Sequence, residues 1–443
     1  MLPYFYKNKT DYYTKKRTLK NRCLNKNICR SLRIRNCYTN SNYKGILKFL
    51  AEKHFLRNDY QSTGNTAILK IPKKFSFTEN PKETLHTLQR LVGMFENPRV
   101  RQIYIDHREC EELEVSASLM MDTILYELDT RRRMMGMPVN FFGALKNDAD
   151  NSKITDVQDV LIWSGVLKHL NVIPRIENPN HIETLDFYDD YIKCNKNIEH
   201  DEAGQKVAEY FNRCYNKIDF EISEEGITKI SDMVAEIVLN CDNHSGNSPR
   251  RWFCQGHYHI NSKENTDVGE CQLTIISIGD SFYESINNHG TEFIKGKLKS
   301  QYKKIEGKWK NLLDIIRKGK EKELYYLLFC LQENISRFQD KTKDRGKGTV
   351  TLFENFQELG KTMDGKKPIL SITSGSSQII FDGTYKMSEN EKGIRIIAFN
   401  ESNDLNIAPD GKYVHNIDTF FPGVVINLKF YIDRCYLEKV VKK

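Results

Sequence analysis

Three polar residues stand four positions apart in the stretch from Ile230 to His244. In a helix, Glu236, Asn240 and His244 would line up along one stripe. A separate apolar stripe comprises Val234, Ile237, Val238 and Cys241. An amide oxygen can ligate Mg²⁺, and a carboxylate one turn away can polarise a water molecule toward a phosphate. The same residue types also form ordinary solvated helix faces, so this pattern alone leaves both interpretations open.

The run from Cys271 to Phe282 predicts a strand that ends near an acidic residue. Its apolar residues alternate, so that Ile276, Ile278 and Asp280 would share one face. This spacing favours an inward-facing carboxylate at the strand end.

A basic segment with two glycines, 343–349, precedes a helical stretch over 352–359. Glycines let backbone N–H groups approach a phosphate, and the N-terminus of a helix favours negative charge. Arg345 and Lys347 would pair with that charge. A basic surface turn is the alternative interpretation.

The elements that must position these residues form two predicted units. Strand-like and helix-like runs alternate as β–α–β–α–β and predict an α/β domain over 61–175. Residues 176–221 are polar and asparagine-rich, which indicates a connector. Residues 222–443 begin with a helix, continue with strands and contain a helical insertion over 285–340. We therefore expect an α/β unit followed by an α+β unit.

Basic residues are concentrated at the beginning of the chain. Residues 1–60 are expected to be an arm followed by a short helix. The first 50 residues carry a net charge of +12, whereas the whole chain carries +8. Such an arm can contact nucleic-acid phosphates. Contact with an acidic protein partner and a solvated tail are the alternatives.

The bulk composition is that of a soluble globular protein, with 39% hydrophobic and 28% charged residues. No apolar run approaches the roughly 20 residues of a membrane span, and the first residues lack the apolar core of a signal peptide. We expect a cytoplasmic protein without membrane contact, whose 11 cysteines are reduced.

The helical segment resembles the N-box of the GHKL superfamily (gyrase, heat-shock chaperones, histidine kinases and MutL), which often reads Glu-x3-Asn-x3-His. All three positions match. The resemblance implies a Bergerat-type α/β sandwich, in which helices pack on a mixed sheet and ATP binds with Mg²⁺. It implies that Asn240 ligates Mg²⁺, that Glu236 is the general base, and that His244 belongs to the same nucleotide site.

The strand after this helix occupies the place of the family's Asp-x-Gly-x-Gly motif, whose Asp binds the adenine amino group. The preferred adenine contact is Asp280, although Phe282 and Glu284 replace the two glycines. A shifted register keeps Gly279 as the first glycine and puts Ser277 in the Asp position. Both registers stay open.

Three further segments follow in the family's order. The first resembles the phosphate lid and assigns nucleotide contacts to Arg345, Gly346, Lys347, Gly348 and Thr349. The run 368–375 resembles the next strand with its Ser-Gly turn. The run 421–428 resembles the closing Pro-Gly-Thr strand and adds Gly423 to the site.

The upstream unit resembles a STAS-like domain, the fold of anti-sigma-factor antagonists. The resemblance rests on a strand, 101–106, followed by a loop and the run 113–119, which enters a helix. It aligns Ser116 with a serine that is phosphorylated in that family. Glu114, Val115 and Ala117 depart from the family's motif, and a purely structural role at the helix start is the alternative.

Together these patterns predict an ATP-binding regulatory protein, a Mg²⁺-dependent ATPase whose nucleotide orders a lid and thereby controls a partner protein or the STAS-like domain. One alternative is a protein-serine kinase of anti-sigma type. Another is a non-enzymatic scaffold with a degenerate nucleotide site, since the glycines after Asp280 are missing.

Overall fold

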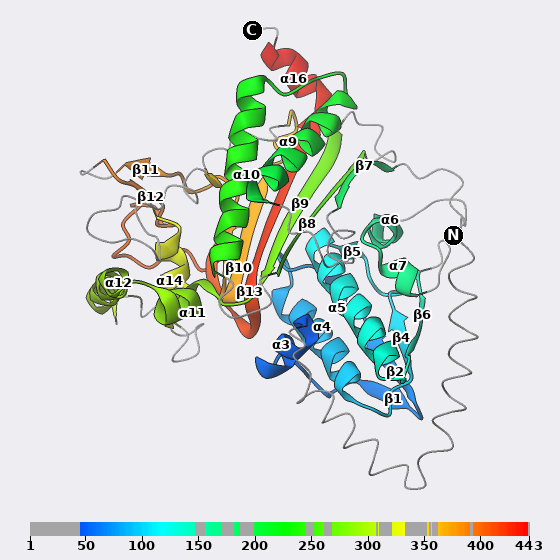
Figure 1. Cartoon of the computed structure of the whole chain (residues 1–443). Coiled ribbons are helices and arrows are strands. Elements are labelled where there is room, and N and C mark those ends of the chain that lie inside the picture. The colour runs from blue at the N-terminus through cyan, green and yellow to red at the C-terminus, as the bar shows by residue number, and fades with distance from the viewer. Residues whose placement is uncertain are drawn as a thin grey trace.

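The computed structural model describes residues 45–146, 156–170, 181–186, 199–244, 251–260, 268–306, 309, 321–332, 352–353, 356, 362–389 and 393–441. These residues form a mixed α/β protein with two main sheets, one in each half of the chain (Figure 1). The expected α/β character is confirmed.

The N-terminal domain is a four-stranded sheet with helices on it. In chain order its elements are α3 (Ile46–Glu52), β1 (Gln61–Thr63), β2 (Thr66–Lys70), β3 (Lys74–Phe75), α4 (Pro81–Glu96), β4 (Gln102–Asp106), β5 (Glu112–Leu113), α5 (Val115–Met134), β6 (Asn140–Ala144), α6 (Asp156–Trp163) and α7 (Val166–His169). The sheet order is β1-β2-β4-β6. The pairs β2–β4 and β4–β6 are parallel, so α4 and α5 are the crossover helices that parallel neighbours require. The expected β–α–β–α–β order is confirmed.

The C-terminal domain is built on five longer strands. Its elements are β7 (His181–Asp186), α9 (His200–Asn216), α10 (Glu224–His244), β8 (Arg251–Ile260), β9 (Val268–Ile278), α11 (Phe282–His289), α12 (Glu292–Ile305), α14 (Glu321–Cys330), β10 (Ile369–Phe381), β11 (Ser388–Glu389), β12 (Arg395–Ile396), β13 (Val414–Asp433) and α16 (Arg434–Val441). The order β10-β13-β9-β8-β7 is antiparallel at every described pair. This differs from the expected mixed sheet. A connection as short as the seven residues 261–267 between β8 and β9 allows only antiparallel pairing.

The segment expected to be a connector belongs to this second domain. Strand β7 is the edge strand of its sheet, and α9 packs beside α10 on one face of the sheet (Figure 1). Apolar residues of α9, among them Val207 and Phe211, are fully buried in the core there. The segment contains many asparagines, so its composition predicts a connector although part of it forms an amphipathic helix.

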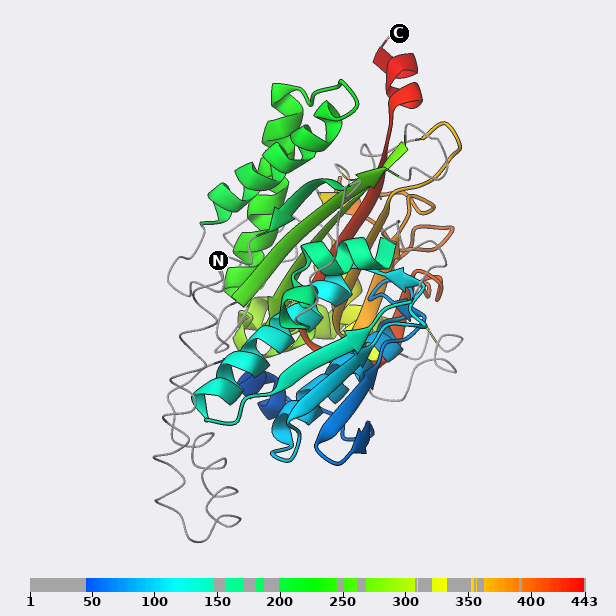
Figure 2. The same cartoon turned by 90° about the vertical axis from the view of Figure 1, so that its right-hand side faces the viewer.

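Helix α5 lies between the two sheets. Fifteen of its 20 residues are buried, which is the behaviour of a helix that contacts protein on nearly all sides. Its apolar residues share a core with those of β2 and β4 in the N-terminal sheet, and the helix also contacts β8 and β9. Figure 2 displays the resulting order of layers: N-terminal sheet, helices α4 and α5, C-terminal sheet, and helices α9 and α10.

The interface between the domains is a continuous apolar core. The core of the N-terminal domain extends to the following side chains of the C-terminal sheet: Phe253, Ile276, Ile278, Ile417, Phe421 and Val425. Phe421 is fully buried, and its ring lies edge-on to Phe55 and Phe77, with centroids 6.3 and 5.6 Å away. The two domains therefore share one core.

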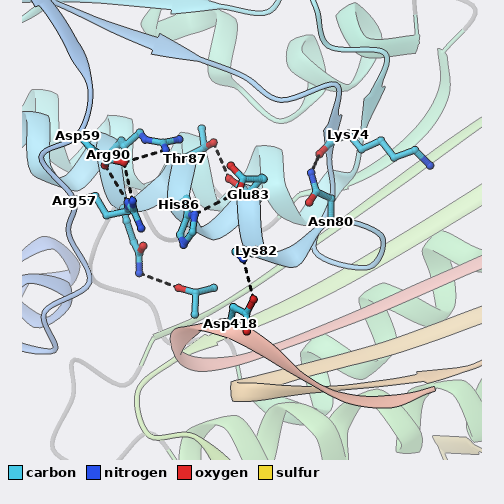
Figure 3. A network of polar contacts seen from close by, with 12 residues as sticks. Arg57, Asp59, Lys74, Asn80, Lys82, Glu83, His86, Thr87, Arg90 and Asp418 are labelled. Carbon is cyan, nitrogen blue, oxygen red and sulfur yellow. Dashed lines mark hydrogen bonds and ion pairs between the residues drawn. The ribbon is translucent and has the colours of Figure 1, made fainter. Parts of the chain in front are cut away.

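Polar contacts surround this apolar interface. On α4, Lys82 forms an ion pair with Asp418 of β13 at 2.8 Å (Figure 3). On the same helix, the side-chain amide of Gln89 donates to the hydroxyl of Thr419 at 3.3 Å. One exposed contact and one buried contact thus join α4 to the second domain. None of the described helices is both long and apolar enough to cross a lipid bilayer.

Replacing Phe421 with alanine tests the shared core. We expect Phe421→Ala to lower the free energy of unfolding by about 3–5 kcal/mol, because it removes a fully buried aromatic ring. Chemical denaturation followed by circular dichroism measures the change. The matched control is Phe293→Ala on α12, where the ring is 38% exposed and the loss should stay below about 1 kcal/mol. Equal losses in both variants would contradict the shared core.

Candidate functional site

Helix α10 carries the acid and the amide that the sequence singled out. Its apolar stripe is buried against the sheet and α9, with Val234 and Val238 fully buried. Glu236 and Asn240 are half-buried at the border of that packed face. The amide nitrogen of Asn240 donates to Oε1 of Glu236 at 3.5 Å. Because this bond uses the amide nitrogen, a metal ion would contact Asn240 through its carbonyl oxygen, a type of ligand atom that Mg²⁺ prefers.

The end of α10 lies beside the end of β9. His244 is the last residue of the helix, and six residues lead from it to Arg251, the first residue of β8. Arg251 pairs with Ile278, the last residue of β9. The helix end and the strand end therefore meet at one end of the sheet (Figure 1).

The two faces of β9 separate the two candidate adenine contacts. Cys271, Leu273 and Ile275 face the core under α9 and α10. Ser277 continues this alternation and pairs with Trp252 and Val424, which belong to the same core. Ser277 therefore lies on the same side of the sheet as Glu236 and Asn240.

Ile276 and Ile278 lie on the opposite face, against the N-terminal domain. Asp280 follows them beyond the strand end, where its carboxylate contacts Lys53 and His289. Its carboxylate lies 3.7 Å from Nζ of Lys53, at the end of α3, and 3.3 Å from Nε2 of His289. Ile276, Ile278 and Asp280 therefore lie on one side of the sheet, as their spacing in the sequence predicts, and this side faces the N-terminal domain.

The residues after Asp280 begin a helix. Ser281 is the N-cap of α11 and forms a capping box with Glu284. Glu284 also pairs with Lys53 at 2.7 Å. Phe282 and Glu284 therefore belong to a helix that begins directly after the strand end, and glycine at either position would weaken this helix.

Glycines meet at the same end of the sheet. Gly423 in β13 has φ +140°, and a side chain there would approach the carbonyl oxygen of Ser277 to 2.0 Å. The N–H of Gly279 donates to the carbonyl of Pro422 at 3.1 Å. Gly375, expected in a Ser-Gly turn, lies instead inside strand β10 at a register shift, where it pairs with Phe421. The segments around 279, 375 and 423 are thus brought together.

Some of the expected site residues lie outside the described residues. These are the lid residues Arg345, Gly346, Lys347, Gly348 and Thr349, and residues 1–44 of the basic arm. For His244, only the backbone is described, as the end of α10.

Ser116 is fully buried in the first turn of α5. Its hydroxyl donates to Oε2 of Glu114 at 2.9 Å. That carboxylate also accepts from the backbone N–H of Phe77 at 2.6 Å and of Thr78 at 3.2 Å. Glu114 therefore ties the preceding loop to the start of α5. Ser116 lies against the face of the C-terminal sheet opposite to α10.

A cavity of about 360 Å³ lies beside Ser116, between the domains. The N-terminal domain contributes residues from the start of α5, the 76–79 loop, β5 and α6. The C-terminal sheet contributes the polar half of its face from β8, β9, β10 and β13. Where the apolar half packs against α4 and α5, this polar half lines an open space.

A charged pair lies in the sheet wall of this cavity. Nζ of Lys429 lies 3.0 Å from Oε2 of Glu270, whose other oxygen accepts from Gln272. Burial opposes ionisation of Glu270, yet the neighbouring Lys429 and His259 hold its pKa below the ordinary value. Burial likewise opposes the charge on Lys429, but Glu270 raises the pKa of that amine.

A second polar contact of this wall involves the N-terminal domain. Nε2 of His257 lies 3.1 Å from Oδ2 of Asp159 on α6. Among the described residues, no three His, Cys, Asp or Glu side chains are grouped as a metal site.

The sequence interpretation did not identify this cavity. A signal was present, because Glu270, Gln272 and Thr274 alternate with the buried apolar residues of β9. The same period occurs in β8 with Gln255, His257 and His259. Alternation alone indicates a half-exposed sheet face, and only the docking of α5 and α6 turns that face into the wall of a cavity.

Comparisons with protein-family models, with curated proteins and with solved structures found no match. The functional argument therefore rests on the residues of this chain.

Replacing Lys429 with methionine tests the charged pair. We expect Lys429→Met to cost about 1–3 kcal/mol of unfolding free energy at neutral pH, because Glu270 loses its charged partner. The lowered pKa of Glu270 contributes stability above its unfolded pKa, and this contribution is lost as the pH falls through the folded value. The difference between variant and wild type should therefore shrink on acidification below roughly pH 4.

Chemical denaturation at a series of pH values measures this difference. The control is Lys295→Met, because Lys295 pairs with Glu292, whose side chain is 93% exposed. A difference that stays constant from neutral to acidic pH would contradict the assigned role of Glu270.

Proposed function

We propose that this chain is an ATP-binding regulatory protein that holds ATP with Mg²⁺ between the second half of α10 and the adjoining end of the C-terminal sheet. The supporting observation is convergence. The Glu236–Asn240 pair lies on the helix that covers the face of the sheet on which Ser277 lies, and Gly423 pairs with Ile278, the neighbour of Ser277. This arrangement is consistent with a GHKL-type domain of the Bergerat fold preceded by a STAS-like domain.

In this proposal Asn240 ligates Mg²⁺ through its carbonyl oxygen, and Glu236 polarises the attacking water. Ser277 is the favoured contact for the adenine, since it lies on the face of β9 that α10 covers. Asp280 is less suited to that role because it is paired with Lys53 and His289. The lid residues 345–349 would contact the phosphates.

Regulation follows from the two faces of β9. Ser277, on the nucleotide side, lies between Ile276 and Ile278, whose side chains belong to the shared core with the N-terminal domain. A shift of the strand end on nucleotide binding would therefore change the packing under α4 and α5. We propose this as the route by which nucleotide controls the STAS-like domain or a partner protein.

A protein-serine kinase that modifies its own Ser116 is disfavoured, because the sheet separates Ser116 from α10 and the hydroxyl is buried. A kinase acting on a separate protein stays an alternative. A scaffold without enzymatic activity is the interpretation that remains if no nucleotide binds.

Nucleotide affinity tests the site. We expect the purified chain to bind ATP in a Mg²⁺-dependent manner. Loss of a residue that hydrogen-bonds a metal ligand weakens metal binding by roughly 10- to 100-fold. Asn240→Ala removes the proposed ligand itself, so it should weaken ATP binding by at least as much. Isothermal titration calorimetry with and without Mg²⁺ measures both effects. Asp232→Ala, at an exposed position of the same helix, should leave the affinity unchanged. If wild type and Asn240→Ala bind ATP with equal affinity in the presence of Mg²⁺, Asn240 is not the metal ligand.

The rate of phosphate release from ATP tests the proposed role of Glu236 as general base. We expect Glu236→Gln to slow ATP hydrolysis by about 10²- to 10⁴-fold, the usual contribution of a general base, with nucleotide binding retained. The matched control is Asp232→Asn, which removes a charge from the exposed face of α10. If label from the γ-phosphate appears on an added protein and not as free phosphate, the kinase alternative is supported.

A further inference from the structure

Helix α12 is the most lysine-rich of the described helices. Five of its 14 residues are lysines, and its single acidic residue, Glu292, pairs with Lys295 at 3.1 Å. Outside the first 50 residues and α12, the chain carries a net charge of −8. The helix is therefore a positively charged surface on an otherwise acidic body, which favours contact with a polyanion.

The long side chains of α12 follow two stripes along the helix. Residues three and four positions apart lie on one side of a helix. The first stripe contains Lys295, Lys299 and Lys303, and the second contains Phe293, Lys297 and Lys304. Gly296 and Ser300 are exposed between the stripes, and a side chain at Gly296 would meet no atom within 4 Å. Small residues thus separate two rows of long side chains.

Most of this charge is not neutralised within the protein. Lys299, Lys303 and Lys304 are exposed and form no ion pair with any described residue. Lys299 and Lys303 are one helical turn apart, and like charges at this spacing destabilise a helix. A polyanion that contacts them would relieve this repulsion and would not have to displace a partner.

An exposed aromatic ring on the same helix is a second, independent observation. Phe293 is 38% exposed, whereas Ile294 and Leu298 are fully buried. Proteins that bind single-stranded nucleic acids combine cationic side chains for the phosphates with aromatic rings on which bases stack. Figure 1 shows α12 on the side of the C-terminal domain remote from the N-terminal domain, where an extended ligand has access.

The burial of the apolar side of α12 argues against a membrane surface. An amphipathic helix binds a bilayer through its apolar face. In α12 this face, which includes Ile294, Leu298 and Tyr302, belongs to the core of the C-terminal domain, where the helix packs on α11 and α14. An acidic protein would also pair with the lysines, but an aliphatic side chain would serve such a partner as well as Phe293 does. Substitution of Phe293 therefore separates a nucleic acid from an acidic protein.

We propose that the exposed face of α12 binds single-stranded nucleic acid. The phosphates lie along Lys299 and Lys303, and a base stacks on the ring of Phe293. Because these contacts are to the phosphate backbone and to the face of a base, the site has little sequence preference. This binding does not depend on the proposed ATP site.

Fluorescence anisotropy of the full chain with a labelled oligothymidylate of about 12 nucleotides tests this proposal. The titration is done without Mg²⁺, so that the proposed ATP site does not contribute, and at several salt concentrations. We expect the double variant Lys299→Gln/Lys303→Gln to reduce the slope of log K against log salt by about 1.4, the value for two phosphate contacts of a single strand. Phe293→Leu should weaken binding at least about fivefold through the loss of one base stack, with an unchanged slope. Phe293→Tyr should retain the affinity.

The matched control is Lys70→Gln/Lys73→Gln, which removes two exposed lysines of the N-terminal domain and should leave the slope unchanged. Residues 1–50 are present in every variant, so their contribution cancels in the comparison. Thermal unfolding verifies that each variant folds. Three results would overturn the proposal: an unchanged slope in the α12 double variant, an equal reduction in the control, or wild-type affinity of Phe293→Leu, which would indicate a surface for an acidic protein.

Discussion

The packing of α5 between two sheets is the constraint on which the rest of the structure depends. A helix that buries 15 of its 20 residues cannot be stable in an isolated layer, because its apolar surface needs a partner on both sides. The helix shares a core with the strands of the N-terminal sheet and also contacts β8 and β9. The two halves of the chain therefore fold around a common core, and the C-terminal sheet has no solvent-facing side where the helix lies.

Strand alternation then assigns each residue of the C-terminal sheet to one of two environments. In β9, Ser277 faces the layer of α10, whereas Ile278 contacts the N-terminal domain. The candidate nucleotide site and the interdomain cavity are consequently separated by the thickness of one sheet. Any ligand that moves a strand on one face also alters the packing on the other, which gives a direct physical route between the two domains.

The polar half of the interdomain face is stabilised by pairing. Thr78 of the N-terminal domain shares a hydrogen bond with Ser371 at 2.7 Å, and Thr274 donates to Asn427 at 2.6 Å. Lys429 and Glu270 lie beside them. The polar groups of this half of the face are therefore held by contacts between the domains and within the sheet.

The sequence by itself determined the local elements, because periodicity depends only on neighbouring residues. The helix containing Glu236 and Asn240, the β–α–β–α–β order and the strands β8, β9, β10 and β13 follow from spacing, whereas β7 lies in the segment expected to be a connector. The sequence left the choice between Asp280 and Ser277 open, and it concealed α9 in a polar segment. Only the tertiary structure decided which face of β9 meets α10, and that Lys53 pairs with Asp280. Such contacts join residues far apart in the chain, and no local pattern encodes them.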